Sequence, residues 1–524
     1  MIASQNALAG IIVFALLTIP SLCHGQTEPA AKENRAKSVD SLTDSHGDTL
    51  KGTADEKIVK FNSAPVNKEN QIKSIDSTKF NMFGYLSNDD TAYNKKSPLW
   101  IPVVGIIGTN VATNLVDRYI LNLDFSRVSF TSWGRTLQAG WPWGSGWKWD
   151  QDRFGNNFLL HPYSGSLFFN SARASGYDFW ESAPYTLLGS YMWKIFGENG
   201  TPEREDLINT TFTGVFLGEV LYRLSSNLLD DRTTGTERFF RELGGAAIDP
   251  ERFFYRLFQG KLNRVTTKEV YQEEPLNIEL SAGMRVENHE NNFGTGPLNA
   301  LVNVQLDYGY PWEKRELKPY DFFTLHTGIN LGVGRKFLEN LIGYGILYGK
   351  HVQPGDLEMV WGLFQHYDYF DNKSFELGTI ALGGGIMSKY PVSKDAYILA
   401  NFHLGVVPFG GNSTQLGPDT SQFRDYNFCG GMETKLEAGL NLDWASVQLN
   451  GYYYWLNTYV GTPGNNFVGI IRPRITIKLI KNLNLGFEEL AYITDRYTSD
   501  FGNFHAVRTE QRLYLMLNGG NLKL

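Results

Sequence analysis

Cysteine is nearly absent from this chain of 524 residues, which contains only Cys23 and Cys429. A fold that depends on internal disulfide bonds is therefore excluded. The sequence also has no phosphate-binding loop, no HExxH motif and no CxxC pair, and its nine histidines are scattered. We therefore expect no cofactor and no metal site of a standard type.

An excess of one charge is also lacking, because 48 basic residues nearly balance 55 acidic residues and leave a net charge of −7. This balance provides no positive field for DNA or RNA and excludes nucleic acid as a partner. A mean hydropathy of −0.28 is too polar for a bundle of transmembrane helices. Aromatic residues are abundant, at 14%, and there are 54 glycines, a composition that suits the strands of an outer-membrane barrel.

The N-terminal region divides into two segments. Residues 1–25, with an apolar run over 8–22, are typical of a secretory signal peptide. A lipid anchor at Cys23 is the alternative, although Leu22 occupies a position that usually holds a small residue. Residues 26–80 are polar and lack an aromatic residue before Phe61, so we expect a disordered linker, with a partner-binding tail as the alternative.

Residues 97–265 are predicted to form a helical domain. Helical patterns cover 99–121, 162–174, 182–196, 201–228, 237–243 and 250–258. Within the first segment, Asn110, Asn114 and Arg118 recur every four residues, which favours a packed or membrane-surface helix over a transmembrane one. Gly214 and Gly218 would allow a neighbouring helix to approach closely.

Five tryptophans lie between residues 133 and 149. Tryptophan favours the headgroup level of a membrane, so this stretch could be an interfacial anchor. A loop packed over the helices is the equally supported alternative.

The stretch HPYSGSLFFNSAR, residues 161–173, places polar residues among aromatic ones. On a helix, Tyr163, Ser166, Asn170 and Arg173 would share one face. Other apolar helices also carry polar residues, and an unpaired buried polar group costs roughly 1–3 kcal/mol. We therefore predict a ligand-binding or structural polar cluster that consists of Asn157, Tyr163, Asn170, Arg173, Asn209, Glu219 and Arg223.

A catalytic interpretation is also open. It assigns His161 as general base, Ser166 or Ser164 as nucleophile, and Glu198 or Asp206 as the group that orients the imidazole. The structural alternative is that His161, which precedes a proline, caps a helix.

Two further sets of polar residues have competing interpretations. Glu219 and Arg223, four residues apart, would form a helix-packing pair or take part in catalysis. Asp150 and Asp152 carry oxygens that suit calcium, but the loop lacks the later acidic ligand of known calcium loops. We therefore predict no metal.

From residue 276 onward the hydropathy alternates with a period of two. Twelve strands are predicted, at 277–288, 299–311, 321–333, 340–352, 358–370, 374–388, 396–408, 426–442, 446–460, 466–479, 482–497 and 504–517. An even number closes into an antiparallel barrel with both ends on one side and no free edge. A soluble β-sandwich is the alternative, but its strands would be shorter.

The fold class is therefore α+β, with an N-terminal helical domain followed by an antiparallel transmembrane β-barrel of about twelve strands over 276–524. Because the helical domain precedes the first strand, we expect it on the periplasmic side of the outer membrane, either beneath the barrel or partly inside it.

Three runs carry a resemblance to a bacterial family: WDQDRFGNNFLLHPYSGSLFFNSAR, GSYMWKIFGENG and EREDLINTTFTGVFLGEVLYRLS. Over residues 97–230 the chain resembles domain of unknown function 3943. The resemblance implies a Gram-negative envelope protein, often with a following outer-membrane sheet, and no known activity. Lys194 stands where an acidic residue is expected, which puts any mechanism that needs that carboxylate in doubt. The characteristic positions correspond to Asn157, His161, Pro162, Tyr163, Gly165, Asn170, Arg173, Ser182, Gly189, Trp193, Glu198, Asp206, Gly214, Gly218, Glu219 and Arg223.

Three functions follow from these patterns. The first is an outer-membrane barrel protein whose helical domain gates, plugs or docks lipid or another envelope component, with outer-membrane lipid as the expected partner and an envelope protein as the second class of partner. The alternative is a membrane-interface hydrolase that acts on lipid or glycolipid, with His161 at its centre. The third is a simple pore.

Overall fold

The computed structural model describes residues 96–149, 154–267, 269–289, 294, 296–331, 337–372, 374–413, 426–499 and 502–522. The predicted signal peptide, the alternative lipid anchor at Cys23, the linker over 26–80 and the aspartates at 150 and 152 lie outside these residues.

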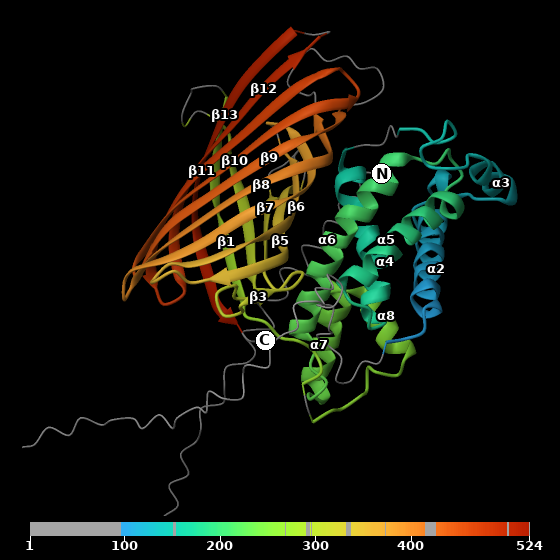
Figure 1. Ribbon diagram of the computed structural model, residues 1–524, viewed down its shortest axis with the longest axis horizontal. Helices are drawn as coiled ribbons and strands as arrows, with labels where there is room; N and C mark the ends of the chain where they lie inside the picture. The colour runs from blue at the N-terminus through green and yellow to red at the C-terminus, as the bar shows by residue number, and fades with distance from the viewer. Residues whose placement is uncertain are drawn as a thin grey trace, which may run out of the picture. The chain divides into compact units, whose positions relative to one another are not determined.

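The N-terminal part of the described chain is helical (Figure 1). Its helices are α2 (Trp100–Leu115), α3 (Phe130–Gln138), α4 (His161–Ala174), α5 (Phe179–Met192), α6 (Arg204–Leu228), α7 (Gly235–Ile248) and α8 (Pro250–Phe258). The helices predicted at 162–174 and 250–258 match α4 and α8 to within one residue. Helix α3 was not predicted; it is capped by Ser129, the residue before it, whose side chain accepts a hydrogen bond from the Ser132 amide.

Helix α2 is followed by a π-helical turn, and its polar stripe is used for packing. Asn114 donates hydrogen bonds of 2.9 Å to the carbonyls of Ser126 and Gly197, and Asn110 contacts the carbonyl of Gly189. No helix in the part of the chain that the structure describes has the length and apolar character needed to cross a membrane. The prediction that α2 packs against neighbouring helices therefore agrees with its contacts.

The C-terminal part is a closed antiparallel barrel of twelve long strands, as predicted. Strands β1 and β13 pair with each other, β5 pairs with β6, and the two-residue strand β3 adds to β5. The strands are β1 (Leu276–His289), β2 (Leu298–Tyr308), β3 (Glu316–Leu317), β4 (Phe323–Asn330), β5 (Leu338–Val352), β6 (Glu358–Asp371), β7 (Glu376–Ser393), β8 (Ala396–Ser413), β9 (Tyr426–Leu442), β10 (Ala445–Val460), β11 (Gly464–Ile480), β12 (Leu483–Thr498) and β13 (Gly502–Leu522).

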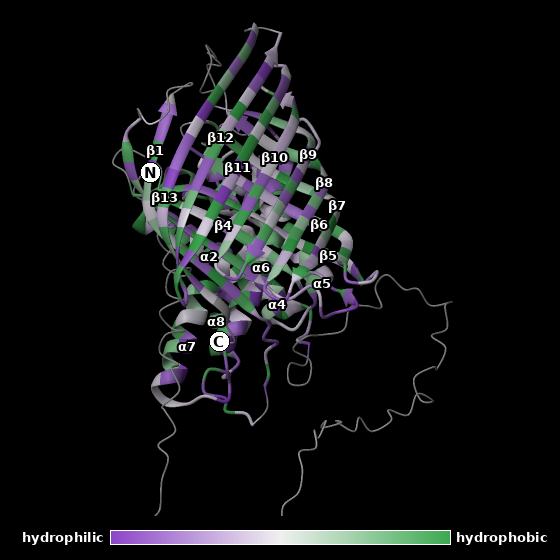
Figure 2. Ribbon diagram, turned by 90° about the vertical axis from the view of Figure 1, so that its left-hand side faces the viewer, coloured by the Kyte–Doolittle hydropathy of each residue, from purple (hydrophilic) through white to green (hydrophobic). Residues whose placement is uncertain are grey.

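The two faces of the wall can be assigned from contacts across the barrel. A guanidinium nitrogen of Arg472 on β11 lies 3.2 Å from Nε2 of His326 on β4, although β12, β13, β1 and β2 separate these strands along the wall. Both side chains must therefore point into the lumen. Their strand neighbours, such as Ile471, point outward. Figure 2 shows the resulting alternation of hydrophobic and hydrophilic residues along strands such as β12.

Exposed apolar side chains cover the outward face of β9 to β13. They include Leu436, Leu440, Leu449, Trp455, Ile471, Ile475, Ile477, Phe487, Leu513 and Leu515. An apolar outer band on a closed antiparallel sheet is the defining feature of an outer-membrane-type barrel.

Side chains fill much of the lumen. Lys435 Nζ lies 2.7 Å from Asp368, and the Tyr454 hydroxyl donates a hydrogen bond of 2.8 Å to the same carboxylate. Arg285 pairs with Glu339 and Glu510 from opposite directions along the wall. A buried apolar layer adds Phe370, Leu377, Ala381, Val407, Cys429, Leu456, Val468 and Leu490. At these levels the described barrel has a packed core.

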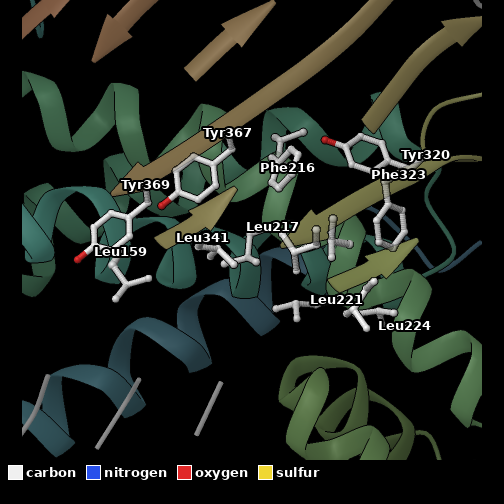
Figure 3. Packing of buried hydrophobic residues seen from close by; sticks show 14 of the residues in the cluster. Leu159, Phe216, Leu217, Leu221, Leu224, Tyr320, Phe323, Leu341, Tyr367 and Tyr369 are labelled. Atoms are coloured by element: carbon white, nitrogen blue, oxygen red, sulfur yellow. The ribbon is translucent and has the colours of Figure 1, made fainter. Parts of the chain in front are cut away.

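The helical domain lies against the outside of the barrel. Residues 365, 367 and 369 of β6 alternate with lumen-facing residues such as Asp368, and they therefore point outward. Gln365 donates a 2.9 Å hydrogen bond to the carbonyl of Phe212 in α6, and Tyr367 donates to the carbonyl of Phe158. The apolar cluster that joins the two parts takes residues from α6 and from several strands (Figure 3).

This arrangement differs from one of the expected placements. The sequence left open that the helical domain sits partly inside the barrel, but the buried apolar clusters of the lumen consist of residues from strands and turns. The outward-facing Gln365 and Tyr367 instead hold the domain at the wall. The physical reason is that the lumen is already occupied by its own side chains.

Candidate functional site

Helices α4 and α6 cross closely because both carry glycine at the contact. A Cβ atom on Gly214 would lie 2.5 Å from Cα of Gly165, a distance that no real side chain tolerates. Gly218 makes room for the ring of Phe169 in the same way. The close crossing brings the polar residues of the two helices into direct contact at both ends of the interface.

At one end, five charged or titratable residues form what we call the Lys194 cluster: His161, Lys194, Glu198, Glu203 and Asp206. Nε2 of His161 lies 3.3 Å from Oδ1 of Asp206. Lys194 Nζ contacts the other Asp206 oxygen and lies 2.7 Å from Glu198 and 3.0 Å from Glu203. The π-helical turn η5 (Trp193–Gly197), which follows α5, brings Lys194 to the first turn of α6.

The charges of this cluster settle the protonation of Lys194. Burial alone would lower its pKa, but Asp206 and then Glu198 and Glu203 hold the pKa well above its ordinary value. Lys194 therefore stays charged and cannot act as a base. Burial, together with repulsion from Asp206 and Glu198, raises the pKa of Glu203 to about 7 despite the attraction of Lys194. The cluster can therefore exchange a proton near neutral pH.

At the other end of the interface, Glu219 is enclosed by two arginines. Arg173 donates to both carboxylate oxygens, at 2.7 and 3.1 Å, and Arg223 Nε donates at 2.8 Å. Arg223 also donates to the carbonyl of Pro319, in the turn before β4. This group joins α4, α6 and the barrel, and removing one partner of such a buried set typically costs about 3–5 kcal/mol.

A third group consists of amides and hydroxyls at the wall. Asn157 Nδ2 donates to the hydroxyl of Tyr426 on β9, at 2.5 Å. Asn209 donates to the backbone carbonyl of Asn157 and accepts from Thr213 at 2.9 Å. The carbonyl of Asn157, and that of Phe158, which accepts from Tyr367, belong to the π-helical turn η4 (Asn156–Leu160), where the usual helical pairing is shifted.

The remaining predicted residues lie along α4. Asn170 donates a side-chain hydrogen bond to the buried carboxyl of Asp249, which also lies near Tyr163. The side chain of Ser166 is fully buried, and its hydroxyl donates a hydrogen bond of 2.6 Å to the carbonyl of Tyr163. Neither of these bonds involves His161.

The structure therefore brings together some of the predicted site residues and separates others. His161, Glu198 and Asp206, three of the four residues of the catalytic hypothesis, share the Lys194 cluster. The seven residues of the predicted polar cluster divide among the groups around Glu219, Tyr426 and Asp249. Sequence reasoning missed the central place of Lys194 and the part of Glu203, although Lys194 stood out as a basic residue where an acid was expected.

The tryptophan-rich stretch is also divided. The side chains of Trp141 and Trp143 are largely exposed, whereas Trp147 is buried and donates to the carbonyl of Gly140. Trp147 therefore packs as expected for a loop over the helices. Trp141 and Trp143 are exposed, as expected for an interfacial anchor.

Residues 146–251 match the model of a family described as "Domain of unknown function (DUF3943)". The match starts later and ends later than the resemblance noted from the sequence, and it contains the residues that the helical domain contributes to the three polar groups described above. No curated protein matches the chain.

The solved structures to which the chain is similar include outer-membrane barrels. Three of these are the outer membrane channel DcaP of Acinetobacter baumannii (8% identity, TM-score 0.22, covering 46% of this chain and 96% of that one), the NanC porin (7%, 0.26, 46% and 98%) and an outer membrane channel from Pseudomonas putida F1 (9%, 0.27, 47% and 97%). Likenesses this low say nothing about what this chain does.

Proposed function

We propose that this protein is an outer-membrane barrel that works as a lipid-docking scaffold, with membrane lipid held against a helical domain attached to the outside of the wall. The observation that carries the proposal is that helices such as α2, α7 and α8 expose apolar side chains, whereas charged residues such as Asp206, Glu219 and Arg256 are buried. Helices in water show the opposite pattern.

Helix α2, which has no charged residue, shows the exposed apolar face most clearly. Trp100, Val104, Ile107, Val111 and Leu115 are all exposed and recur every three or four residues. They form one continuous apolar stripe along the helix. Water-soluble proteins rarely leave such a stripe uncovered, and lipid is the medium that would cover it next to a lipid-facing wall.

The turns of the barrel support a periplasmic orientation for its terminal end. At the end that holds Leu276 and Leu522, three connections have only two residues each, at 394–395, 443–444 and 481–482; the other two are 353–357 and 309–322, which contains β3. Between the described strands, no connection at the other end is as short as two residues, and the longest there is 414–425. Outer-membrane barrels place short turns in the periplasm, so α7 and α8, which lead into β1, would lie near that side.

The filled lumen bears on the other functions considered from the sequence. A simple pore needs a continuous aqueous path, and the buried ion pair between Lys435 and Asp368 is part of a packed core that occupies the lumen at its level. Plugging by the helical domain is likewise not favoured by its contacts with the outer wall. Within the first hypothesis, lipid docking is compatible with this attachment and is supported by the exposed apolar stripe of α2.

The hydrolase alternative has little geometric support. The pair of His161 and Asp206 resembles a base with its orienting acid. However, the hydroxyl of Ser166 is buried and donates to a backbone carbonyl. Under the scaffold proposal, His161→Ala in cells leaves the lipid composition unchanged; altered turnover of one lipid class would instead favour hydrolysis.

The proposal is tested by measuring what surrounds α2 in a bilayer. A spin label at Val111→Cys in the reconstituted full-length protein should be more accessible to oxygen, which concentrates in lipid, than to a water-soluble nickel chelate. Matched labels are Ile475→Cys on the outer wall and Lys394→Cys in a short turn. The proposal expects Val111 to behave like Ile475; behaviour like Lys394 would overturn it.

A further inference from the structure

The hairpin of α7 and α8 encloses a buried group of charges that the polar groups described above do not include. Asp231 lies 2.9 Å from both Arg238 and Arg256 and 2.6 Å from Arg264. Glu242 lies 2.8 Å from Arg238 and 2.5 Å from Arg256. We call Asp231, Arg238, Glu242, Arg256 and Arg264 the Asp231 cluster.

Positive charge exceeds negative charge in this cluster. Three guanidinium groups share two carboxylates. The backbone amide of Lys261 donates to the carbonyl of Arg256, and its ammonium, which lies over the ring of Tyr255, is a fourth cation that Arg264 and Arg256 repel. Burial lowers the pKa of Lys261 to about 8, with repulsion from Arg264 and Arg256 as the next causes. The site is therefore electrostatically suited to an additional anion.

One of the arginines also has unused donors. Arg256 is only 3% exposed, yet its Nε and Nη1 have no hydrogen-bond acceptor among the described residues. A guanidinium has five donors in a planar fork that matches the oxygens of a phosphate. Leaving buried donors without acceptors is unfavourable, and an anion with several oxygens would satisfy them.

The outer surface of the hairpin identifies the kind of molecule that would supply this anion. The side chains that face outward are aromatic and apolar: Phe239 is 62% exposed, Phe254 49% and Phe258 82%. Phe254 and Phe258 stack with ring centroids 6.5 Å apart. A cationic interior beneath an aromatic surface fits a molecule that has both a phosphate and apolar chains.

We infer that the Asp231 cluster and Lys261 bind the phosphate of a membrane phospholipid whose acyl chains lie along Phe254 and Phe258. This inference rests on the proposed lipid-docking function and names its ligand class and binding residues. Inorganic phosphate shares the chemistry of the headgroup and is the competing source of the anion.

The test uses the full-length protein in detergent micelles and three probes: a short-chain phosphatidylglycerol, inorganic phosphate, and a diacylglycerol with the same chains. We expect the phospholipid to bind at least about tenfold more tightly than either other probe, since each supplies only half of the recognised chemistry. Equal binding of inorganic phosphate would overturn the lipid assignment, and equal binding of diacylglycerol would overturn recognition of the phosphate.

Variants locate the site. Arg264→Gln and Lys261→Gln, on the partly exposed side of the cluster, should each weaken phosphatidylglycerol binding by about tenfold, as expected for a lost charge-assisted hydrogen bond. Arg127→Gln, at an exposed arginine outside the hairpin, is the matched control and should bind like the unmodified protein. Equal affinity in all three variants would overturn the inference. Those outcomes leave lipid docking at α2 intact, whereas a failure of the spin-label test at Val111 would remove the proposed function itself.

Discussion

The outer surface of the barrel divides into two regions: a bare face, where side chains are exposed, and a covered face, which lies under the helices. On β10 to β13 the outward side chains are apolar and bare, as at Leu449, Ile475 and Leu513. On β6 and β9 the outward positions under the helices carry amides and hydroxyls, such as Gln365, Tyr367 and Tyr426. Polar groups of this kind would lack partners in lipid, and here they bond to helix carbonyls or to Asn157.

The comparison shows that the helical domain covers one part of a wall whose remaining outer face is apolar. The covered face has the chemistry of a protein interface, and the bare face has the chemistry of a lipid contact. Each face should therefore respond differently to the same kind of substitution, and the following predictions use matched positions on the two faces.

The largest effect is expected at Phe158, whose ring is completely buried between the helices and the wall and stacks 6.2 Å from Phe409. Phe158→Ala should cost about 3–5 kcal/mol in the free energy of docking, because it leaves a cavity at the covered face. Limited proteolysis in nanodiscs should then release fragments of the helical domain. Phe487→Ala on the bare face is the control, and equal protease resistance of both variants would contradict the prediction.

The second effect concerns the bare face. Ile475→Arg places a charge on the lipid side and should cost about 2–4 kcal/mol if the position lies near the bilayer centre. The measurement is the urea midpoint of barrel unfolding in lipid vesicles. Ile475→Leu serves as the control and should remain close to the unmodified protein. An arginine tolerated without loss would mean that this face does not contact lipid.

A smaller effect is expected from the removal of a single hydroxyl at the covered face. Tyr367→Phe loses the hydrogen bond to the carbonyl of Phe158 and should cost about 0.5–1.5 kcal/mol. The matched change, Tyr453→Phe at an exposed bare-face position, should have almost no effect. Denaturant titration of both variants measures the difference, and identical midpoints would show that Tyr367 does not hold the domain.

The smallest effect is a dependence of the stability of the helical domain on pH. The pKa of Glu203 is raised to about 7 from an ordinary value of 4.5, so the folded state binds this proton more tightly than the unfolded state. Stability of the helical domain should therefore fall as pH rises from about 4.5 to 7. Glu203→Gln should flatten this part of the curve, and an unchanged slope would contradict the assignment.

The barrel could be predicted from the sequence because alternation is a local signal. The strand predicted at 426–442 coincides with β9, and the other long strands differ mainly at their ends. Strand β6 also contained a sign of its contact with the helical domain, because residues 364–370, FQHYDYF, do not alternate cleanly between apolar and polar. The reason is that both faces of this stretch are buried, one by the lumen and the other by the helices.

The site was less accessible to sequence reasoning. His161 and Asp206 could be singled out because each is a polar residue on a mostly apolar helix. The central position of Lys194 depends on the π-helical turn after α5 and on the approach of that turn to α6, which are both tertiary features. The attachment of the domain to the outer wall also depends on which barrel residues face outward, and the sequence gives that only after the register is known.

The attachment of the helices to the wall can be tested by photochemical cross-linking at Tyr426, a position where p-azidophenylalanine preserves the ring. In the full-length protein in native membranes, irradiation of Tyr426→p-azidophenylalanine should give an adduct within the chain that contains Asn157, whereas the same label at Tyr453 should react with lipid. An adduct of the 426 label with lipid alone, in a correctly folded barrel, would contradict the account.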